Sequence, residues 1–532
     1  MKQADIHKKN SKGAKSLKRP NTLNSILVSA VKNSPNAPYL YFEGKCWTYR
    51  NVDDAVNRTA KALLELGVMP GDRIAIWMSN RPEWVIAQYA TTRLGAVLVP
   101  LNTRLRRDDL AYALNDSGAR AIFTQASTDS FSYTKLLNEI LDADQCPELK
   151  HILVAREQGA DLAPLMTGWT QLQDIGTNSS LQPSPAVNPD DMAYIVYTSG
   201  TTSAPKGVML SHTNLNNSYN YAGNYLEDDI IFVAYPMFAV TGCHNSVLGS
   251  AIAGASLVLQ ERFDSAEALT LIEKYKCTVY NGMTDTIKAI SQVPEFKSAH
   301  TKSLRHANVF PRRPEHRPLF KLLNFVTAGT GYGMTETSGP VTNALDTVED
   351  FALGEGKPWA GNLIRLVDPE NNDVKQGDVG AILVSSSQLM LGYFNKPEAT
   401  QKAINSEGWL CTGDMGYFSP DGVLVWSGRN DDVYKTSGFN VSGLEVESFL
   451  SAYPNLANVA VIGVPDDKKG MVGAAFIIPK LEGEITLKDI QSFCSGKIAS
   501  HKIPGHVISL TSFPLTPNGK VRKLQLREEH FS

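Results

Sequence analysis

Helices and strands are predicted to alternate between residues 52 and 100. An amphipathic helix over 52–66 ends at Gly67, and a strand over 73–77 follows it. A helix over 83–94 and a strand over 96–100 continue the same order. Strands that alternate with helices in this way form mostly parallel sheets with helices packed on their faces. The chain is therefore predicted to contain a layered α/β domain.

Length and composition narrow the class of protein. A chain of 532 residues is too long to fold around one compact core, so two or three domains are predicted. A net charge of −3 gives no electrostatic basis for a nucleic acid or an anionic membrane as the main partner. The longest apolar stretch, 247–259, is short and interrupted by Gly and Ser, so no transmembrane segment is predicted. The six scattered cysteines contain no CxxC pair and indicate free thiols in a reducing, cytoplasmic environment.

Residues 1–20 are predicted to form a basic, disordered arm. Lys or Arg occupies seven of the first nineteen positions, and no apolar run lies among them. A signal peptide needs such a run, so none is predicted, and a targeting role stays open beside that of a plain tail.

A buried strand followed by a polar loop is predicted over residues 194–207. Ile195 to Tyr197 are β-branched or aromatic, as is usual in a buried strand. The loop after them contains hydroxyls, two glycines, a proline and Lys206. Backbone N–H groups, hydroxyls and an ammonium group together suit a polyphosphate. The loop is not a Walker A sequence, because Gly207 follows the lysine, and an ordinary polar turn is the alternative interpretation.

A second glycine-containing turn spans residues 331–337, with the sequence Gly-Tyr-Gly-Met-Thr-Glu-Thr. The carboxylate of Glu336 can hold Mg²⁺, a hard cation that prefers oxygen ligands and keeps substrate phosphates as partners. The hydroxyl of Thr335 can donate a hydrogen bond to an α-phosphate oxygen. We therefore expect nucleotide chemistry at this turn.

Both stretches resemble the adenylate-forming (AMP-binding) superfamily, which includes acyl- and aryl-CoA ligases, luciferases and the adenylation domains of peptide synthetases. The resemblance extends from about residue 22 to 525 through five motifs in the superfamily's order, with Ser203 where the superfamily usually has glycine. It implies an α/β fold with a large N-terminal AMP-binding domain of several subdomains over 21–428. It also implies a small mobile α/β lid over 429–532, with a hinge at Asp431 and strands over 459–464 and 474–478.

The same resemblance implies the residues that bind ATP. Tyr332 would stack on adenine, Thr335 would contact the α-phosphate and Glu336 would hold Mg²⁺. Asp414, in a Thr-Gly-Asp turn, would accept hydrogen bonds from the ribose hydroxyls, although a Thr-Gly-Asp turn in isolation is more often only structural. Arg429 would lie near the ribose and the phosphate. The implied phosphate loop consists of Thr198, Ser199, Gly200, Thr201, Thr202 and Lys206.

Catalytic and pocket residues are implied in the same way. Lys520 matches the superfamily's catalytic lysine, which would bridge the acid's carboxylate and the α-phosphate, although a lone lysine is more often a solvated turn residue. A helix over about 244–252 would form one side of the acyl pocket, and His244 at its start is expected to be solvated and without a role. The implied CoA site consists of Lys435, Gly438 and Phe439, and the implied acyl pocket includes Phe238, Ala239, Gly242 and Met283.

Residues 307–324 depart from the superfamily's pattern. The superfamily has an apolar strand there that ends in a Gly-Gly-Ala turn against the adenine, and this turn is absent. Pro311, Pro314 and Pro318 predict that the segment forms neither a central strand nor a long helix. A diverged nucleotide pocket, a surface insertion and a local reading-frame error are three accounts that the sequence leaves open.

The predicted function is that of a two-step acid–CoA ligase. A carboxylic acid, fatty or aromatic, would react with Mg-ATP to give acyl-AMP and pyrophosphate, and the CoA thiol would then displace AMP. Positioning and charge neutralisation would supply the catalysis. Three alternatives remain. The first is an adenylating enzyme that loads a carrier protein, and the second is an oxidising luciferase, for which no specific sequence feature speaks. The third is a non-catalytic binding protein on the same fold, which Ser203 and the missing glycine turn favour. The chain is expected to be a monomer or a homodimer.

Overall fold

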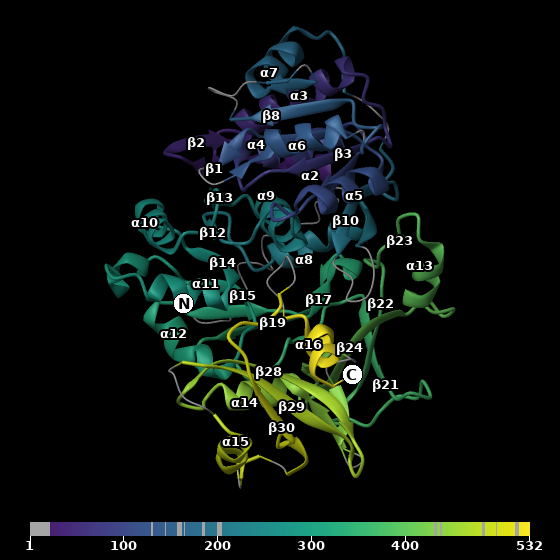
Figure 1. Ribbon diagram of the computed structural model, residues 1–532. Coiled ribbons are helices and arrows are strands. Elements are labelled where there is room, and N and C mark those ends of the chain that lie inside the picture. Colours follow the sequence, from purple (N-terminus) through teal and green to yellow (C-terminus); the bar gives the residue numbers. More distant parts are fainter. Residues whose placement is uncertain are drawn as a thin grey trace. The chain divides into compact units, whose positions relative to one another are not determined.

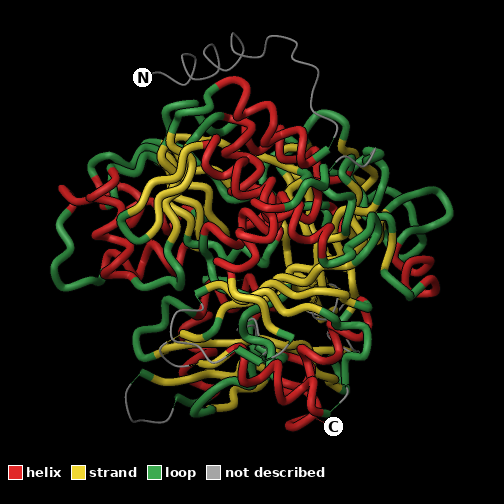
Figure 2. Tube along the Cα trace, turned by 90° about the horizontal axis from the view of Figure 1, so that it is seen from above, coloured by secondary structure: helices red, strands yellow, loops and turns green. Residues whose placement is uncertain are grey.

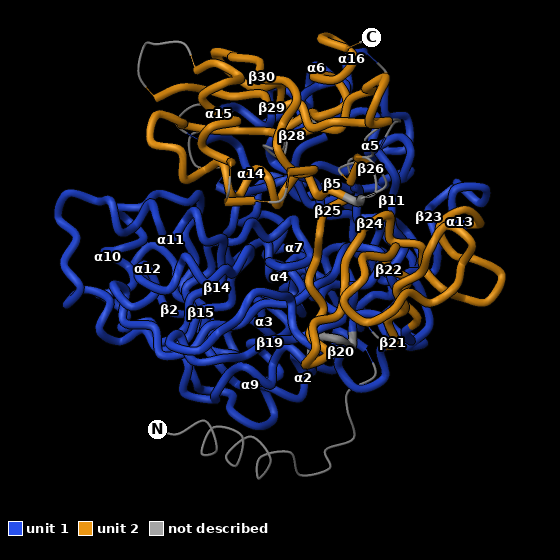
Figure 3. Tube along the Cα trace, turned by 90° about the horizontal axis from the view of Figure 1, so that it is seen from below, with its two compact units in different colours: residues 1–200, 204–362, 386–400 blue, residues 201–203, 363–385, 401–532 orange. Residues whose placement is uncertain are grey.

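The computed structural model describes residues 22–128, 131–143, 145–156, 162–163, 165–183, 187–198, 205–429, 433–436, 439–480, 485–495, 497–498, 500–515 and 521–531. The arm expected over 1–20 lies outside them. The chain divides into two compact units (Figure 3). Unit 1 comprises residues 1–200, 204–362 and 386–400, and unit 2 comprises 201–203, 363–385 and 401–532.

Unit 1 contains two large sheets, here named sheet A and sheet B. Sheet A has nine strands, with parallel pairing from β1 to β16 along its centre and antiparallel strands at both edges. In spatial order they are β2 (Lys45–Thr48), β1 (Pro38–Phe42), β13 (Ser256–Leu259), β12 (Ile230–Val233), β14 (Val279–Met283), β15 (His306–Phe310), β16 (Thr327–Thr330), β19 (Thr342–Thr347) and β20 (Lys357–Pro358).

Sheet B has eight strands, and its pairs from β10 to β9 are parallel. In spatial order they are β23 (Gly392–Tyr393), β11 (Lys206–Ser211), β10 (Met192–Thr198), β4 (Val97–Pro100), β3 (Arg73–Trp77), β5 (Ala119–Gln125), β8 (His151–Ala155) and β9 (Met166–Gly168). Two short hairpins add β6 (Ser127–Thr128) with β7 (Phe131–Ser132), and β17 (Gly333–Met334) with β18 (Gly339–Pro340).

Helices cover these sheets, and Figure 2 shows helices packed beside the strands. The α-helices that begin in unit 1 are α2 (Leu23–Asn33), α3 (Tyr49–Glu65), α4 (Pro82–Arg93), α5 (Arg107–Ser117), α6 (Tyr133–Asp142), α7 (Trp169–Asn178), α8 (Ser218–Ala222), α9 (Gly249–Ala253), α10 (Ser265–Tyr275), α11 (Thr284–Ser291), α12 (Arg317–Leu322) and α13 (Pro397–Ala403). Short 3₁₀ turns are η1 (Asn214–Asn217), η3 (Ser298–Thr301), η4 (Pro314–His316) and η5 (Thr335–Thr337), and η2 (Thr241–Leu248) is a π-helix.

The alternation predicted between residues 52 and 100 is confirmed by α3, β3, α4 and β4. Thr48 caps α3 by accepting a hydrogen bond from the backbone N–H of Asn51 at 3.2 Å. Gly67, which follows the helix, adopts a φ of 76°, a conformation that few other residues tolerate. Local capping and turn chemistry therefore explain why the sequence pattern was sufficient here.

A buried layer of helices separates the two sheets of unit 1 (Figure 1). α4 packs on β3 and β4 of sheet B, α9 packs on β13 of sheet A, and α2 contacts both helices. Except for Glu83, every residue of α4 is buried, as expected for a helix with protein on all sides. The amide of Gln88 in α4 donates to the carbonyl of Cys243 in η2 at 3.1 Å, which joins this layer to the region of the candidate site.

The prediction that residues 307–324 contain no central strand is wrong. β15 lies between β14 and β16 in sheet A, and its first four residues are buried. Its pairing ends at Phe310, so Pro311 comes after the last ladder position and costs no hydrogen bond. Pro314 and Pro318 stand in the first turns of η4 and α12, where proline is tolerated. The segment is thus part of the sheet rather than a surface insertion.

Unit 2 contains two sheets with mainly antiparallel pairing, and β30 joins the second of them in parallel. The first has the spatial order β21 (Asn362–Val367), β22 (Gly380–Ser386), β24 (Leu410–Phe418) and β25 (Leu424–Arg429). The second has the order β27 (Phe439–Ser442), β26 (Val433–Thr436), β29 (Gly470–Pro479) and β28 (Leu456–Asp466), and β30 (His506–Ser509) pairs with β29. Its helices are α14 (Gly443–Leu450), α15 (Leu487–Cys494) and α16 (Lys523–Phe531), with the 3₁₀ turn η7 (Ser500–Lys502). β28 and β29 contain the strands predicted over 459–464 and 474–478.

Among the described residues, no helix is both long enough and apolar enough to cross a membrane. All six cysteines carry free thiols, four of them buried.

Candidate active site

The two ends of the predicted phosphate loop meet in a hairpin of sheet B. β10 is buried along its centre, as the sequence predicts, and β11 runs antiparallel to it, with Thr198 opposite Lys206. Both residues are half-buried. A Cβ on Gly207 would stand 2.6 Å from a methyl carbon of Ile195, so this position after Lys206 requires glycine. Ser199, Gly200, Thr201 and Thr202 lie outside the described residues.

Tyr393 connects the end of this loop with the second motif. Its ring lies 5.0 Å from the ammonium nitrogen of Lys206, and its hydroxyl donates to Oε1 of Glu336 at 2.9 Å. The backbone N–H of Met390 also donates to the carbonyl of Glu336 at 2.8 Å. The strand β23, which carries Tyr393, pairs with β11. Two motifs about 130 residues apart in the chain therefore share one contact network.

Close backbone approach explains the glycines of the second motif. A Cβ on Gly331 would stand 2.4 Å from the carbonyl oxygen of Thr342, and one on Gly333 would stand 2.2 Å from that of Gly339. Tyr332 is buried, and its backbone N–H donates to Oγ1 of Thr342 at 2.8 Å. The turn is thus held rigidly where β16 leaves sheet A, which fixes the direction of the residues that follow.

The residues of this turn fit a magnesium ion that retains phosphate and water ligands. Glu336 is 7 % exposed, and Oε1 of its carboxylate is held by Tyr393. Mg²⁺ commonly takes one or two carboxylates from the protein and its other ligands from phosphates and water. Among the described residues, no group of three or more His, Cys, Asp or Glu side chains could form an all-protein metal site. One buried carboxylate with free coordination sites for phosphate and water fits the needs of Mg²⁺, and the role of Glu336 as its ligand stays a prediction.

A cavity of about 60 Å³ opens beside this turn, within unit 1. It lies where the parallel strands β15 and β16 end, the usual position of ligand sites in α/β sheets. Its walls consist of Tyr221, Tyr235, Thr241, Asn245, Asn308, Val309, Phe310, Gly329, Thr330, Gly331, Pro340, Thr342, Asn343 and Trp359. Most of these residues carry a hydroxyl or an amide. Gly331 belongs to the second motif of the sequence analysis, and residues 308–310 belong to the divergent segment 307–324.

The residues predicted to line the acyl pocket are not among those that line this cavity. Phe238 and Ala239 are half-buried, Met283 is 38 % exposed, and Gly242 is buried against the backbone of Pro236. Their role in acid binding stays a prediction. The helix expected over 244–252 is present as η2 and α9, and two residues of η2, Thr241 and Asn245, reach the cavity.

The expectation that His244 is solvated is wrong. The side chain is fully buried in η2, and its Nε2 lies 2.5 Å from the carbonyl oxygen of Leu215. Burial lowers the pKa of His244 to about 4, so the ring is neutral near pH 7. Sequence position at a helix start predicted exposure, but the helix itself is enclosed by the protein.

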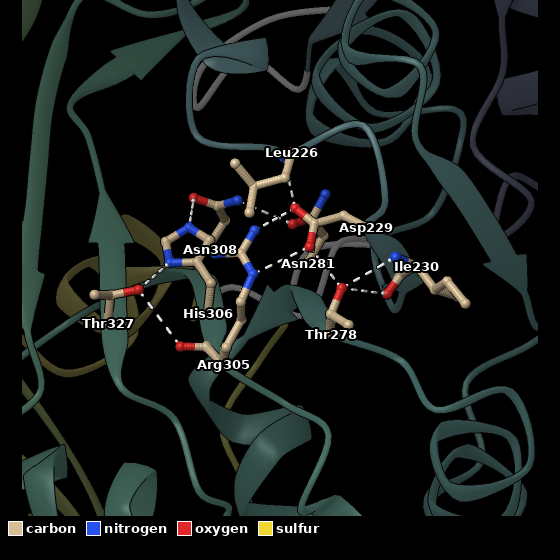
Figure 4. Close-up of polar contacts among 9 residues, drawn as sticks. All are labelled: Leu226, Asp229, Ile230, Thr278, Asn281, Arg305, His306, Asn308 and Thr327. Atoms are coloured by element: carbon tan, nitrogen blue, oxygen red, sulfur yellow. Dashed lines mark hydrogen bonds and ion pairs between the residues drawn. The ribbon is translucent and has the colours of Figure 1, made fainter. Parts of the chain in front are cut away.

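A polar network runs through the core behind the cavity (Figure 4). His306 in β15 hydrogen-bonds Thr327 through Nδ1 at 2.9 Å and Asn308 through Nε2 at 3.0 Å. Asn308 donates to Asn281 in β14 at 3.1 Å. At the other end, Arg305 forms an ion pair with the buried carboxylate of Asp229. The middle strands of sheet A are thus cross-linked by side chains as well as by the backbone.

Stability should fall on acidification because buried histidines are hard to protonate. Burial lowers the pKa of His212, His244 and His306 from 6.5 to about 4 each. Below pH 6.5 the unfolded chain binds protons that the folded chain does not, so the folded state loses stability as the pH falls from 6.5 toward 4. At pH 5 the expected loss is about 2 kcal/mol per histidine.

Urea denaturation at pH 7 and pH 5 measures this effect. The variant His212→Gln should show a smaller change between the two pH values, because one of the buried histidines is removed. Equal midpoints at both pH values would contradict the expectation.

Asp414 and Arg429 lie together in unit 2, as the resemblance implies. They are opposite one another in the pair β24–β25, and Nε of Arg429 lies 3.1 Å from Oδ1 of Asp414. Arg429 also donates to the carbonyl of Thr412 at 2.8 Å. Gly413 has a φ of 73°, which turns the chain so that the Asp414 carboxylate is buried beside the guanidinium.

Several predicted lid residues cannot be placed. Lys520, Asp431 and Gly438 lie outside the described residues. Lys435 and Phe439 belong to the paired strands β26 and β27, and only their backbone is described. Their roles stay predictions.

Comparison with protein families covers most of the chain. The model of the AMP-binding enzyme matches residues 27–394, and that of the AMP-binding enzyme C-terminal domain matches residues 445–520. The chain belongs to the AMP-binding enzyme family. The predicted family and the α/β fold with a large N-terminal and a small C-terminal domain are therefore confirmed.

Relatives of the enzyme act on different acids. It is 32% identical over 508 residues to the putative acyl-CoA synthetase YngI of Bacillus subtilis, covering 91% of this chain and 92% of that protein. It is 29% identical over 494 residues to the long-chain-fatty-acid–CoA ligase FadD13 of Mycobacterium tuberculosis, covering 91% and 93%. The solved structure of the anthranilate CoA ligase AuaEII with anthranoyl-AMP matches with a TM-score of 0.83 at 26% identity, covering 99% of each chain.

The enzyme is thus an AMP-forming ligase of the acyl-CoA synthetase type. Its substrates are a carboxylic acid, ATP and CoA, and Mg²⁺ accompanies the ATP. Tyr393 belongs to the candidate site, and the sequence analysis assigned it no role. Its position 57 residues after Glu336 gave no signal of the contact that joins them.

Proposed function

We propose that the enzyme joins a fatty or aromatic carboxylic acid to CoA, and that the acyl group binds in the cavity beside Gly331. The observation that carries this proposal is the chain of contacts from Lys206 through Tyr393 to Glu336. It joins the phosphate loop to the turn whose first residue, Gly331, lines the cavity. A triphosphate held by this network would have its α-phosphate close to an acid in the cavity.

In the first step, a carboxylate oxygen of the acid attacks the α-phosphorus, the bond to the β-phosphate oxygen breaks, and pyrophosphate leaves. The loop residues Thr198 to Thr202 and Lys206 hold the phosphates, and Thr335 donates to the α-phosphate. Glu336 would hold Mg²⁺, which would supply positive charge to neutralise the phosphates. Lys520 bridges carboxylate and α-phosphate as charge moves between them. Catalysis thus comes from positioning the substrates, and no covalent intermediate forms on the protein.

In the second step, the CoA thiolate attacks the acyl carbonyl and AMP leaves. We propose that the lid after residue 428 rotates about Asp431, which withdraws Lys520 and brings Lys435, Gly438 and Phe439 to the pantetheine arm. The free thiols of all six cysteines support a reducing, cytoplasmic location for this reaction.

The ribose should be recognised by the pair that Asp414 forms with Arg429. Asp414→Asn keeps the shape of the side chain but replaces a carboxylate, whose two oxygens accept hydrogen bonds from both ribose hydroxyls, by an amide with one accepting oxygen. The KM for ATP should therefore rise about tenfold. The wild-type preference for ATP over 2′-deoxy-ATP should shrink in the variant. An unchanged preference, measured as a ratio of kcat/KM, would assign Asp414 a structural role only.

Pyrophosphate release tests the proposal on the wild-type protein. The assay uses Mg-ATP with a panel of short, medium and long fatty acids and of aromatic acids, with and without CoA. We expect release that depends on the acid, and a thioester product only when CoA is present. Acid-dependent release without any thioester would contradict the second step, and no release with any acid would contradict both.

A further inference from the structure

Helix α5 is hydrogen-bonded to both ends of the hairpin that β10 and β11 form. Near the end of β10, the hydroxyl of Tyr197 donates to Oδ2 of Asp116 at 2.7 Å. Directly before β11, the carbonyl oxygen of Pro205 accepts from the hydroxyl of Tyr112 at 3.0 Å. Tyr112 and Asp116 lie four residues apart in α5, so they project from the same side of the helix. One side of α5 therefore holds both ends of the hairpin.

Lys396 adds a third contact to this cluster. Its ammonium group donates to the hydroxyl of Tyr112 at 3.0 Å and lies 3.4 Å from the carbonyl oxygen of Pro205. Hydrogen bonds from a charged donor are stronger than those between neutral groups. The carbonyl of Pro205 is thus held by two donors, directly before Lys206 in the chain.

The helix is a rigid support for these contacts. Leu110, Ala113 and Leu114 of α5 are buried and belong to the same hydrophobic cluster as Ile195 of β10. The helix ends at Gly118, whose φ of 59° is typical of a glycine that terminates a helix. Side chains on a packed helix hold a site more precisely than side chains on loops.

The pairing of the hairpin separates its two faces. Side chains alternate between faces along a strand, and residues directly opposite one another share a face. Tyr197 is opposite Gly207, and Thr198 is opposite Lys206. A Cβ on Gly207 would stand 3.4 Å from Cζ of Tyr197, so this pair shares the face that α5 holds. Thr198 and Lys206 therefore belong to the other face, where the ring of Tyr393 lies beside the Lys206 ammonium.

We propose that Tyr112, Asp116 and Lys396 are positioning residues that hold Thr198 and Lys206 in the orientation that binds the β- and γ-phosphates of ATP. This inference rests on the proposed function, which assigns the phosphates to the hairpin and its loop. The α-phosphate and the ribose are assigned there to residues of other segments, which leaves the two outer phosphates for the hairpin. The inference adds three residues to the site, none of which contacts ATP itself.

Two variants test the inference by removing one hydroxyl each while keeping the ring. Tyr112→Phe breaks the contact with Pro205, and Tyr197→Phe breaks the contact with Asp116. Each should raise the Kd of Mg-ATP about threefold to tenfold, measured by isothermal titration calorimetry, because one supporting hydrogen bond is lost. The Kd of AMP should stay within about twofold of the wild-type value, since AMP lacks the β- and γ-phosphates.

Tyr275→Phe is the matched control. The hydroxyl of Tyr275, in α10 of unit 1, has no hydrogen-bond partner among the described residues, so its removal breaks no such contact there. This variant should bind both nucleotides as the wild type does.

A double-variant comparison distinguishes positioning from a purely structural role. Lys206→Ala removes the ammonium that Tyr112 is proposed to position. In the Lys206→Ala background, Tyr112→Phe should change the Kd of Mg-ATP by less than about twofold, because the side chain through which it acts is absent. A contact that only stabilised the fold would lower the melting temperature and weaken ATP and AMP equally in both backgrounds.

Each outcome decides the inference. Thermal melting identifies a variant that does not fold, and if Tyr197→Phe fails this check, Tyr112→Phe decides alone. The inference is wrong if the folded variants bind ATP as tightly as the wild type, if they weaken ATP and AMP equally, or if the wild type binds neither nucleotide. A wild type that binds ATP but releases no pyrophosphate with any acid would contradict the proposed function, and the Kd values would still decide the inference.

Discussion

Replacing Lys520 by alanine should slow acyl-adenylate formation by about a hundredfold to a thousandfold, the usual effect of removing one group that stabilises transition-state charge. The ammonium is proposed to neutralise the oxygens of the carboxylate and the α-phosphate as the bond between them forms. Since it acts only in the first step, thioester formation from supplied acyl-AMP and CoA should stay within about threefold of wild type. Pyrophosphate release and thioester formation measure the two steps separately.

Lys468→Ala provides the control for this experiment. Lys468 is an exposed lysine in the turn between β28 and β29, also in unit 2. The control should retain both steps. If Lys520→Ala slowed both steps equally, the proposed role would be contradicted, because Lys520 is proposed to act in adenylate formation alone.

The sequence predicted those parts of the fold that local chemistry determines. β3, α4 and β4 lie within a residue of their predicted bounds, because turn residues and hydrophobic periodicity mark both ends of each element. The strand before the phosphate loop was found for the same reason. The family motifs also located Glu336 and Lys206, but not the tyrosine between them, since that contact depends on how distant segments fold together.

Tertiary context explains the two errors. The prolines after His306 correctly indicate that a strand cannot continue, but they say nothing about the five residues before Pro311. All five pair with β14, and the first three also pair with β16. His306 and Asn308 are also unusual in a central strand, and their partners Thr327 and Asn281 come from neighbouring strands. A single sequence does not reveal which strands will be neighbours, so neither this network nor the burial of His244 could be predicted.

Replacing Glu336 by glutamine should lower kcat for pyrophosphate release by about a hundredfold and raise the Mg²⁺ concentration needed for half-maximal rate. Glutamine keeps an oxygen that can accept from Tyr393, so the fold of the turn should survive while the anionic ligand is lost. Tyr393→Phe removes only the hydrogen bond that orients the carboxylate, and such supporting contacts typically contribute about 10-fold or more in metal affinity or activity. Glu295→Gln, at an exposed position of unit 1, is the charge-matched control.

The order of these effects distinguishes a metal ligand from a structural residue. If Glu336 binds Mg²⁺ and Tyr393 orients it, both variants should shift the Mg²⁺ dependence in the same direction, with Glu336→Gln the more severe. The double variant should then lose little more than Glu336→Gln alone, because the tyrosine acts through the carboxylate. If both variants lower only the melting temperature and leave the Mg²⁺ dependence unchanged, the contact serves packing between β23 and η5. The link from the phosphate loop to the cavity would then be structural, and the metal would have to be held elsewhere.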